Sequence, residues 1–529
     1  MFNLFKAFIV VFTLAALTFI VAKPVFLRFM STQDFALRRN LWLALSTAAF
    51  LSPDYWLFLL VATALILYTA SRDSNPVALY MLLLLTLPPL SKQVPTFGLI
   101  NQLFQMNHLR FLSLLLLLPL ALGYFRREPA AADGTLIREP SSRLLLPDVL
   151  ILLYVLMQLV TALPYESFTA SGKRLMIIGV DTLLPYYVLS RACRTREQFR
   201  EVMAAFVLAA LVLVPLGVLE SLKGWLLYAG IEGHWGLDPF MQYLKRGAFL
   251  RAQVNAGHAI VLGFSLSIAV GFWLALQTQV AAARWRWGVL LSLLLCLLMT
   301  YSRGPWVGAA VAWVTYVVLG PNAGRRSVRA IGLLLVVGIG ASISPYSGTI
   351  VDNIPFIGTV GSGTIQYRQQ LAQTSWLLVM QNPVFGSRNF LAYMEQLRQG
   401  EGIIDLVNAY ATIALGYGLV GLGLFLGFFA TILLRCIKAI RQLSAVDPAF
   451  ALTGAAQVAD LVAALVMLLT VNLYMSAGTL VWVLSGMGVA YVRLAKGVLA
   501  SGFEVPVQPQ ALMTRMPVPV GFKSVSRTY

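Results

Sequence analysis

Two arginines, Arg303 and Arg368, are candidates for binding an anion because of their positions in the sequence. Arg303 lies in the turn YSRGPW at 301–306, between two apolar runs, and Arg368 lies near the start of a helix-like stretch. A guanidinium is planar, carries five donors and binds phosphate oxygens in bidentate fashion. Two such groups directed at one point fit a diphosphate. The alternatives are a snorkelling anchor or a pair with an acid such as Glu220 for Arg303, and a solvated helix face for Arg368.

Arg251 and His258 precede another apolar run and are candidates for the same kind of site. Arg251 would be a third phosphate contact, and its alternative is an anchor at the membrane rim. His258 would orient a phosphate or move a proton, because imidazole changes charge near neutral pH. A histidine that only forms a hydrogen bond between helices is the competing interpretation.

Asp405 and Asn408 are the candidate residues for proton transfer and substrate positioning. We expect a helix from about Asp405, which puts the two side chains one turn apart on one face. Asp405 would then accept a proton from an attacking hydroxyl, and Asn408 would position Asp405 or a sugar hydroxyl. The alternative for Asp405 is a helix N-cap. Tyr367, next to Arg368, is a further candidate for substrate positioning.

The composition places these residues in a membrane protein. Of the 529 residues, 59% are hydrophobic and only 11% are charged, with a mean hydropathy of +0.79. Soluble domains carry about 25% charged residues, so an ordinary soluble enzyme is excluded. The net charge of +18 is explained by basic cytoplasmic loops and anionic lipid, and no basic stripe interleaved with aromatic residues indicates nucleic acid.

Apolar runs predict an all-α, polytopic transmembrane bundle of about 12–15 spans. The runs at 40–51 and 77–88 are short enough to be half-helices. We expect N-terminal transmembrane helices over 1–250, a core over 251–435, further transmembrane helices over 436–496, and a cytoplasmic, disordered tail over 497–529. The expected cores of the runs are 3–22, 40–51, 54–70, 77–88, 109–124, 147–163, 174–190, 201–221, 256–276, 287–301, 305–320, 330–345, 418–435, 456–474 and 478–494.

The positive-inside rule orients this bundle with its N-terminus outside. About two thirds of the 39 Lys and Arg, Arg38 among them, then fall in inner loops or the tail. The first span, from Leu4 to Val21, has no cleavage pattern after it and is expected to be retained. Two long outer segments result, 223–255 and 345–416. The second is expected to hold a helix over 364–381, ended by Asn382-Pro383, and long structured loops of this kind are usually functional.

The remaining reactive side chains do not predict a cofactor. The three cysteines, Cys193, Cys296 and Cys436, are scattered, and no histidine pair has metal-ligand spacing, so we expect no disulfide framework, no metal and no cofactor. Asp181 and Asp460 fall within apolar runs, where an acid marks either a proton path or a structural pair.

Four stretches, in their order, resemble the O-antigen ligase and polymerase superfamily of bacterial envelope glycosyltransferases. They are residues 251–263, 301–308, 366–386 and 408–421. They lie between residues 251 and 421, an interval of about a third of the chain. The N-terminal half is similar only in being a bundle of spans.

The resemblance implies a C-type glycosyltransferase fold in the bacterial inner membrane, with the active site facing the periplasm. Such enzymes transfer a glycan with inversion from an undecaprenyl-diphosphate carrier to an acceptor hydroxyl, without a metal or a nucleotide sugar. By position, Arg303 and Arg368 look like the diphosphate-binding arginines of the family. The implied partners are the lipid-linked oligosaccharide, a glycan or lipid acceptor, and membrane lipid, with chain-length regulators or export proteins beside them.

One position departs from the family pattern. Ligases of the family carry His-Asn before the last outer helix, whereas this chain has Val407-Asn408. The base is therefore assigned to Asp405, with His258 as the alternative. The same departure favours a polymerase of exopolysaccharide or O-antigen repeats over a ligase that acts on lipid A core. A transporter of lipid-linked oligosaccharide is a third hypothesis, which the absence of an internal sequence repeat weakens.

Overall fold

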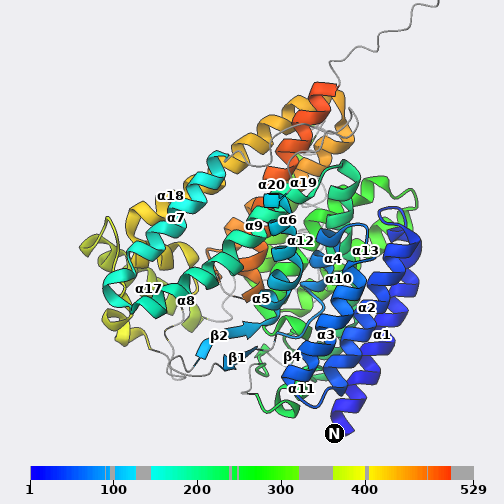
Figure 1. Cartoon of the computed structure of the whole chain (residues 1–529), viewed down its shortest axis with the longest axis horizontal. Helices are drawn as coiled ribbons and strands as arrows, with labels where there is room; N and C mark the ends of the chain where they lie inside the picture. The colour runs from blue at the N-terminus through cyan, green and yellow to red at the C-terminus, as the bar shows by residue number, and fades with distance from the viewer. Residues whose placement is uncertain are drawn as a thin grey trace, which may run out of the picture.

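The chain forms an all-α, polytopic membrane fold, shown by a computed structural model (Figure 1). The structure describes residues 2–89, 91–95, 102–126, 145–237, 241–246, 249–320, 324, 362–398, 404, 406–473 and 475–501. The span expected at 330–345, most of the expected tail, and Asp405 lie outside these residues.

The described part is almost entirely helical, with two short hairpins. The elements in chain order are α1 (Phe2–Phe26), α2 (Thr32–Leu51), α3 (Tyr55–Ala70), α4 (Pro76–Leu83), β1 (Ser91–Pro95), β2 (Gln102–Asn107), α5 (His108–Leu112), η1 (Ser113–Leu117), α6 (Leu118–Arg126), α7 (Leu146–Val160), η2 (Leu163–Tyr165), α8 (Phe168–Ile178), η3 (Gly179–Leu183), α9 (Leu184–Ala192), α10 (Arg196–Lys223), α11 (Ala229–His234), β3 (Lys245–Arg246), β4 (Phe249–Leu250), η4 (Val254–Ala256), α12 (Ala259–Leu276), η5 (Gln277–Gln279), α13 (Ala283–Met299), α14 (Arg303–Leu319), α17 (Ser362–Gln381), η6 (Phe390–Leu397), α18 (Ala409–Val446), α19 (Pro448–Met467) and α20 (Met475–Ser501). Strands β1 and β2 pair antiparallel, as do β3 and β4.

Eight helices of the described residues are long and apolar enough to cross a membrane. Two shorter apolar helical stretches, Tyr55–Ala70 and His108–Gly123, add to them. Almost all residues of α12 are buried, and most residues of α10 and α20 are buried as well. These three helices therefore form the centre of the bundle. Helices α1 and α18 expose apolar side chains on one side, as expected of surfaces that contact lipid.

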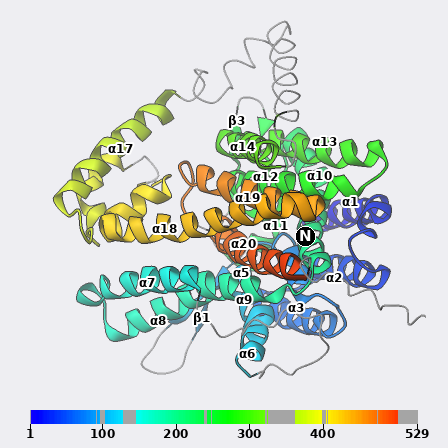
Figure 2. The same cartoon turned by 90° about the horizontal axis from the view of Figure 1, so that it is seen from above.

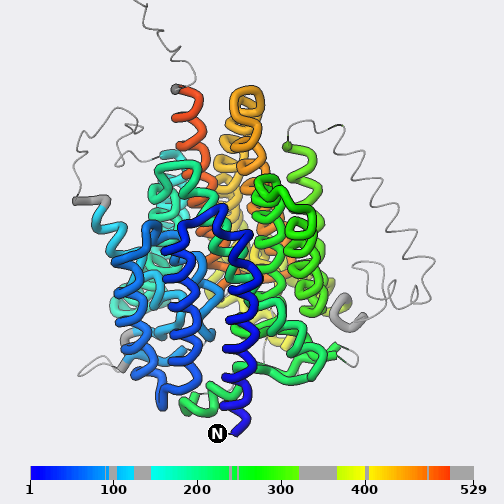
Figure 3. The backbone as a smooth tube through the Cα atoms, turned by 90° about the vertical axis from the view of Figure 1, so that its right-hand side faces the viewer, coloured from blue at the N-terminus to red at the C-terminus, as the bar shows by residue number. Residues whose placement is uncertain are grey.

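The described loops gather at two opposite ends of the bundle (Figures 1 and 3). The N-terminus, α11 and the β3–β4 hairpin lie at one end, whereas α20 runs to the other (Figures 1 and 3). We call the end with the N-terminus the outer end and the other the basic end. At the outer end Trp235 Nε1 donates to Ser52 O and Tyr55 Oη donates to Met106 O, which ties loops distant in sequence together.

Prolines explain where two of the expected spans change their winding. Segments η1 and η3 are π-helical turns, and Pro119 and Pro185 follow them within two residues. Proline lacks an N–H and its ring collides with the carbonyl four residues back, so the preceding turn widens. The run expected at 77–88 contains only the eight-residue, fully enclosed α4. It is a half-helix, whereas 40–51 belongs to the 20-residue α2.

Two glycines join the end of α17 to a kink in α18. Gly386 and Gly418 have φ values of 68° and 67°, and a Cβ at Gly418 would lie 2.2 Å from the carbonyl oxygen of Val384. The close approach lets Leu419 N donate to Pro383 O and Ser387 N donate to Leu415 O. Only glycine combines this φ with this proximity. The joint therefore fixes α17 against α18 beside the outer end.

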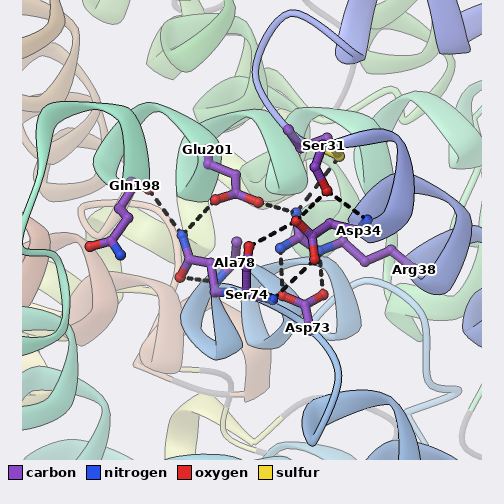
Figure 4. Close-up of polar contacts among 10 residues, drawn as sticks. Ser31, Asp34, Arg38, Asp73, Ser74, Ala78, Gln198 and Glu201 are labelled. Carbon is purple, nitrogen blue, oxygen red and sulfur yellow. Dashed lines mark hydrogen bonds and ion pairs between the residues drawn. The ribbon is translucent and has the colours of Figure 1, made fainter.

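A buried ionic network near the basic end joins α2, α10 and the turn before α4 (Figure 4). Arg38 is fully buried and donates two hydrogen bonds to Asp73, at 2.7 and 2.8 Å, while its third nitrogen lies 2.8 Å from Glu201. Asn75 also donates to Glu201, at 2.9 Å. Arg38 was expected to be a loop charge. It is instead the centre of a structural cluster.

Replacing Arg38 by alanine is expected to lower the free energy of unfolding by about 3–5 kcal/mol, because Asp73 and Glu201 would stay buried without their cation. Titration of the purified protein with SDS in mixed micelles measures this change. Arg39→Ala is the matched control on the same helix, since Arg39 contacts the neighbouring Asn40 side chain. It should change the free energy by less than about 0.5 kcal/mol. Equal stability of the two variants would contradict a structural role for the network.

Candidate functional site

Arg303 is the first residue of α14 and follows a tight turn at the outer end. Tyr301 in this turn has a φ of 47°, which is uncommon for a residue with a side chain. Gly304 packs against Thr470, and a Cβ at this glycine would lie 2.3 Å from Thr470 Oγ1. Helix α14 packs against α12 and α19. Arg303 therefore projects from the end of a helix held in the bundle.

Residues of two short stretches, 245–246 and 249–252, contact the turn before Arg303. Arg246 donates to the carbonyl oxygen of Tyr301 at 2.9 Å, and the Phe249 ring stacks on the Tyr301 ring. Arg251 donates to Thr300 O at 3.2 Å and to Ser302 Oγ at 2.9 Å. The backbone of Ala252 donates to Met299 O. These contacts hold the guanidinium groups of Arg246 and Arg251 beside the turn from which Arg303 projects.

Arg246 senses the charges of Arg303 and Arg368. Burial lowers the pKa of Arg246, and the charges of Arg303 and Arg368 lower it further. Burial, with the charge of Arg246 added, lowers the pKa of Arg251 to about 10. Arg246, Arg251 and Arg303 thus bring three positive charges to the outer end, where β3 lies beside α14 (Figure 2). Arg368 on α17 adds to the positive potential at Arg246. An anion is the ligand that this charge favours.

Helix ends add to this charge. Helices α12, α14 and α18 begin at the outer end, where Ala409 N donates to Leu468 O and Thr470 packs against Gly304. The N-terminus of a helix carries about half a positive elementary charge and unpaired N–H groups. These helix ends therefore add to the positive potential of the arginines, and such a potential favours an anion.

His258 is the N-cap of α12. Its Nδ1 accepts a hydrogen bond from the backbone N–H of Ile260 at 3.2 Å. Burial lowers the pKa of His258 to about 4, and the charge of Arg251 contributes to the shift. The ring is therefore neutral at pH 7. Because Nδ1 is an acceptor, the proton of the neutral ring sits on Nε2, which makes that nitrogen a hydrogen-bond donor.

The expected helix start at Asp405 is wrong. Helix α18 begins at Ala409, and its N-cap is Asn408, whose Oδ1 accepts from Tyr410 N at 2.9 Å and from Ala411 N at 3.2 Å. Asn408 fits the cap because its short side chain reaches the unpaired N–H groups of the first turn. The expectation that Asp405 and Asn408 share a helical face fails with it. Asp405 itself lies outside the described residues.

Helix α17 carries Tyr367 and Arg368 and covers the predicted range 364–381. Arg368 is exposed, whereas Tyr367 is half-buried. Tyr367 packs against a separate apolar cluster of the outer segment that includes Leu371, Met394 and Leu415. The two neighbours therefore differ in surroundings, since Tyr367 anchors α17 while Arg368 extends from it.

Glu220 positions the loop that carries Arg251. It is fully buried, and its carboxylate accepts from the backbone N–H groups of Leu227, Gln253 and Val254 at 2.7–3.0 Å. Val254 has a φ of 49°, a strained conformation for a β-branched residue. Glu220 therefore does not pair with Arg303, as one interpretation of the sequence proposed. Its carboxylate instead binds the backbone of residues 227, 253 and 254.

Replacing Glu220 by glutamine is expected to loosen this loop, because the amide NH₂ would face backbone donors. Trypsin should then cleave at Lys245, Arg246 and Arg251 about 5- to 150-fold faster than in the wild type, given a loss of about 1–3 kcal/mol of local stability. Lys223→Gln, at an exposed position of the same helix, is the matched control. Cleavage at the wild-type rate in E220Q would contradict the positioning role.

The two intramembrane acids differ in their surroundings. Asp181 pairs with Arg110 at 2.8 Å, which is the structural alternative considered from the sequence. Asp460 is fully buried in α19, and a Cβ added at Gly271 of α12 would collide with its carboxyl group. Within the described part of the chain, neither oxygen of Asp460 has a hydrogen-bond partner. A proton path through these acids stays a hypothesis.

Arg246 is the site residue that sequence reasoning missed. The sequence places it only in the basic end of an outer segment, next to Lys245. Its role depends on the β3–β4 hairpin, which turns one of two adjacent cations toward Tyr301 and leaves the other exposed. An outward-facing arginine against the positive-inside bias was the available signal.

A comparison with known families adds to this geometry. Residues 287–426 match the family model described as O-Antigen ligase. The match runs from α13 through the Arg303 turn and α17 into the first half of α18, and it confirms the resemblance found in the motifs. Among curated proteins, none matches this chain.

Proposed function

We propose that this chain, with its O-antigen ligase segment, is an inverting, metal-independent glycosyltransferase that polymerises exopolysaccharide or O-antigen repeats. In this proposal the donor is a glycan on an undecaprenyl-diphosphate carrier at the periplasmic face of the inner membrane. The observation that carries it is the arginine cluster at the outer end. Arg246 and Arg251 donate hydrogen bonds to the turn that leads into Arg303, and the charges of Arg303 and Arg368 lower the pKa of Arg246.

The chemistry follows from the leaving group. An acceptor hydroxyl attacks the anomeric carbon, the bond from that carbon to the diphosphate oxygen breaks, and the carrier diphosphate departs from the opposite face. Negative charge grows on the departing oxygen, and guanidinium groups fixed at a poorly hydrated rim stabilise it more in the transition state than in the ground state. Arg303, Arg368 and Arg251 bind the diphosphate, and Arg246 joins them.

The base of the proposed reaction is Asp405, with His258 as a hydrogen-bond donor. A carboxylate accepts the proton of the attacking hydroxyl directly. His258 Nδ1 already accepts from Ile260 N, so its Nε2–H is suited to a phosphate or sugar oxygen. Asn408 caps α18, and in the proposal this fixes the chain next to Asp405.

Asp405→Asn is expected to lower turnover by about 10²- to 10⁴-fold while carrier binding stays at the wild-type level, because only proton transfer is lost. His258→Gln should lower it by about tenfold, the value of one hydrogen bond of about 1.4 kcal/mol. Single-turnover assays with lipid-linked substrate and a separate binding assay measure both effects. Unchanged turnover in D405N would exclude Asp405 as the base.

A ligase acting on lipid A core or on a protein acceptor is the second candidate, and the description of the matching family favours it. The purified protein, incubated with lipid-linked repeats alone, distinguishes the two. A ladder of lengthened glycans identifies a polymerase. Product that forms only after an outer acceptor is added identifies a ligase. A transporter would give no covalent product in either case, and that outcome would overturn the proposed function.

The proposed domain organisation follows the same division. The core over 251–435 supplies the candidate site residues other than Arg246, and the helices before 251 and over 436–496 form the surrounding membrane bundle. Chain-length regulators and export proteins are the proposed protein partners, and membrane lipid surrounds the exposed faces of α1 and α18.

A further inference from the structure

A cavity of about 430 Å³ opens at the basic end of the bundle, far from the arginine cluster. Its lining comes from α18 and α20, which pack against each other, and from the start of α7. Figure 1 shows α18 and α20 reaching this end of the bundle together. Its volume falls in the range of small-molecule sites, about 300–1,000 Å³.

Four cations line this cavity. Arg435 and Lys438 lie on one face of α18, three residues apart, and Arg493 and Lys496 lie on one face of α20, also three residues apart. Arg493 donates to the carbonyl oxygen of Ser190 at 2.8 Å, which fixes its position. The remaining lining is almost entirely aliphatic and comprises Leu145, Pro147, Ile432, Ala439, Val489, Val492, Ala495 and Leu499, with the amide Gln442.

A carboxylate beside the cavity is already engaged. Asp148 accepts from Arg191 at 2.9 Å, from Tyr186 Oη at 2.6 Å and from the backbone of Leu145 at 2.9 Å. The charges of Arg191 and Asp148 offset each other, and the described lining of the cavity itself holds four cations and no carboxylate. Leu434, next to Arg435 on α18, is 68% exposed. The cationic lining of the cavity thus lies close to an exposed apolar side chain of α18.

We propose that this cavity binds the phosphate headgroup of an anionic phospholipid. The cations contact the phosphate, and the acyl chains lie along the apolar face of α18 that includes Leu434. Basic pockets between transmembrane helices suit such headgroups, because charge and apolar area act together. Under the positive-inside orientation the lipid belongs to the cytoplasmic leaflet. The inference is independent of the proposed glycosyl transfer.

Native mass spectrometry of the delipidated, full-length protein tests this site. Three probes are used: phosphatidylglycerol, phosphatidylcholine with the same acyl chains, and soluble glycerol 3-phosphate. We expect phosphatidylglycerol to bind best. The double variant R435Q/K438Q should weaken its binding roughly 30-fold, since each basic residue contributes about fivefold.

Arg441→Gln is the matched control, because Arg441 is exposed on the same helix and lies outside the cavity lining. It should change the affinity by less than about twofold, as expected of a screened surface charge. If the double variant does not fold, K496Q replaces it, with an expected loss of about fivefold.

Three results would overturn the proposal. Equal binding of phosphatidylcholine would remove the role of headgroup charge. Equal losses in R435Q/K438Q and R441Q would mean that general surface charge attracts the lipid. Binding of glycerol 3-phosphate as tight as that of phosphatidylglycerol would assign the cavity to a soluble phosphate ester.

Discussion

Replacing either Arg303 or Arg368 by alanine is expected to abolish measurable glycan transfer, a loss of at least about 10²- to 10³-fold. The two residues are 65 positions apart and belong to different helices, yet both act on Arg246. A diphosphate leaving group needs charge stabilisation at two phosphates, so neither arginine can replace the other. Assays with lipid-linked substrate measure the loss.

Lysine at either position should restore activity only in part. An ammonium supplies the charge but cannot make the bidentate contact of a guanidinium. We therefore expect R303K and R368K to fall between the wild type and the alanine variants.

Arg398→Ala is the control for these variants. Arg398 is an exposed arginine of the same outer segment and pairs with Glu395. R398A should keep wild-type activity, and all variants should elute from size exclusion as the wild type does. Wild-type turnover in R303A or R368A would contradict the proposal that these two arginines bind the diphosphate.

Arg246→Ala is expected to lower transfer by about 10- to 100-fold, the value of one charge-assisted hydrogen bond. The variant loses a cation between Arg303 and Arg368 and also the donor to Tyr301 O, which holds the turn before Arg303. Since the turn carries a residue at positive φ, its position depends on such contacts.

Lys245→Ala is the matched control for Arg246. The two cations are neighbours on β3, but Lys245 is exposed. Its loss should change transfer by less than about twofold, because an exposed charge is screened. A larger effect in K245A than in R246A would mean that the segment attracts substrate by its total charge and not through a positioned guanidinium.

The membrane architecture could be predicted because it depends on local properties. Apolar length and the alternation of basic loops separate the ends of the bundle, and loops distant in sequence meet at the outer end as expected. The prolines at 119 and 185 altered the winding inside two runs, which hydropathy alone does not reveal. The assignment of Arg38 to an inner loop was wrong, because the sequence does not reveal the ion pairs with Asp73 and Glu201 that allow this arginine to be buried.

The candidate site was predictable where the signal was a residue type in an unusual place. Arg303 and Arg368 stood out as arginines on the outer side, against the bias of the topology. Arg246 did not, because its orientation depends on a two-residue hairpin. Asn408 was assigned to the substrate, yet its side chain caps α18, since a polar residue before an apolar run satisfies the helix end first.

Glu220 shows a further limit. The sequence presents it only as a neighbour for Arg303, whereas the structure places its carboxylate on three backbone N–H groups from two loops. Backbone partners carry no sequence signature, so contacts of this kind become visible only in three dimensions.

The most direct test of the central claim is the binding of polyprenyl diphosphate against polyprenyl monophosphate. The wild type should prefer the diphosphate by at least about tenfold, and R303A and R368A should each lose this preference. The double variant should lose less than the product of the two single losses, because both arginines contact one ligand. Equal binding of both lipids by the wild type, or an unchanged preference in either variant, would contradict the claim.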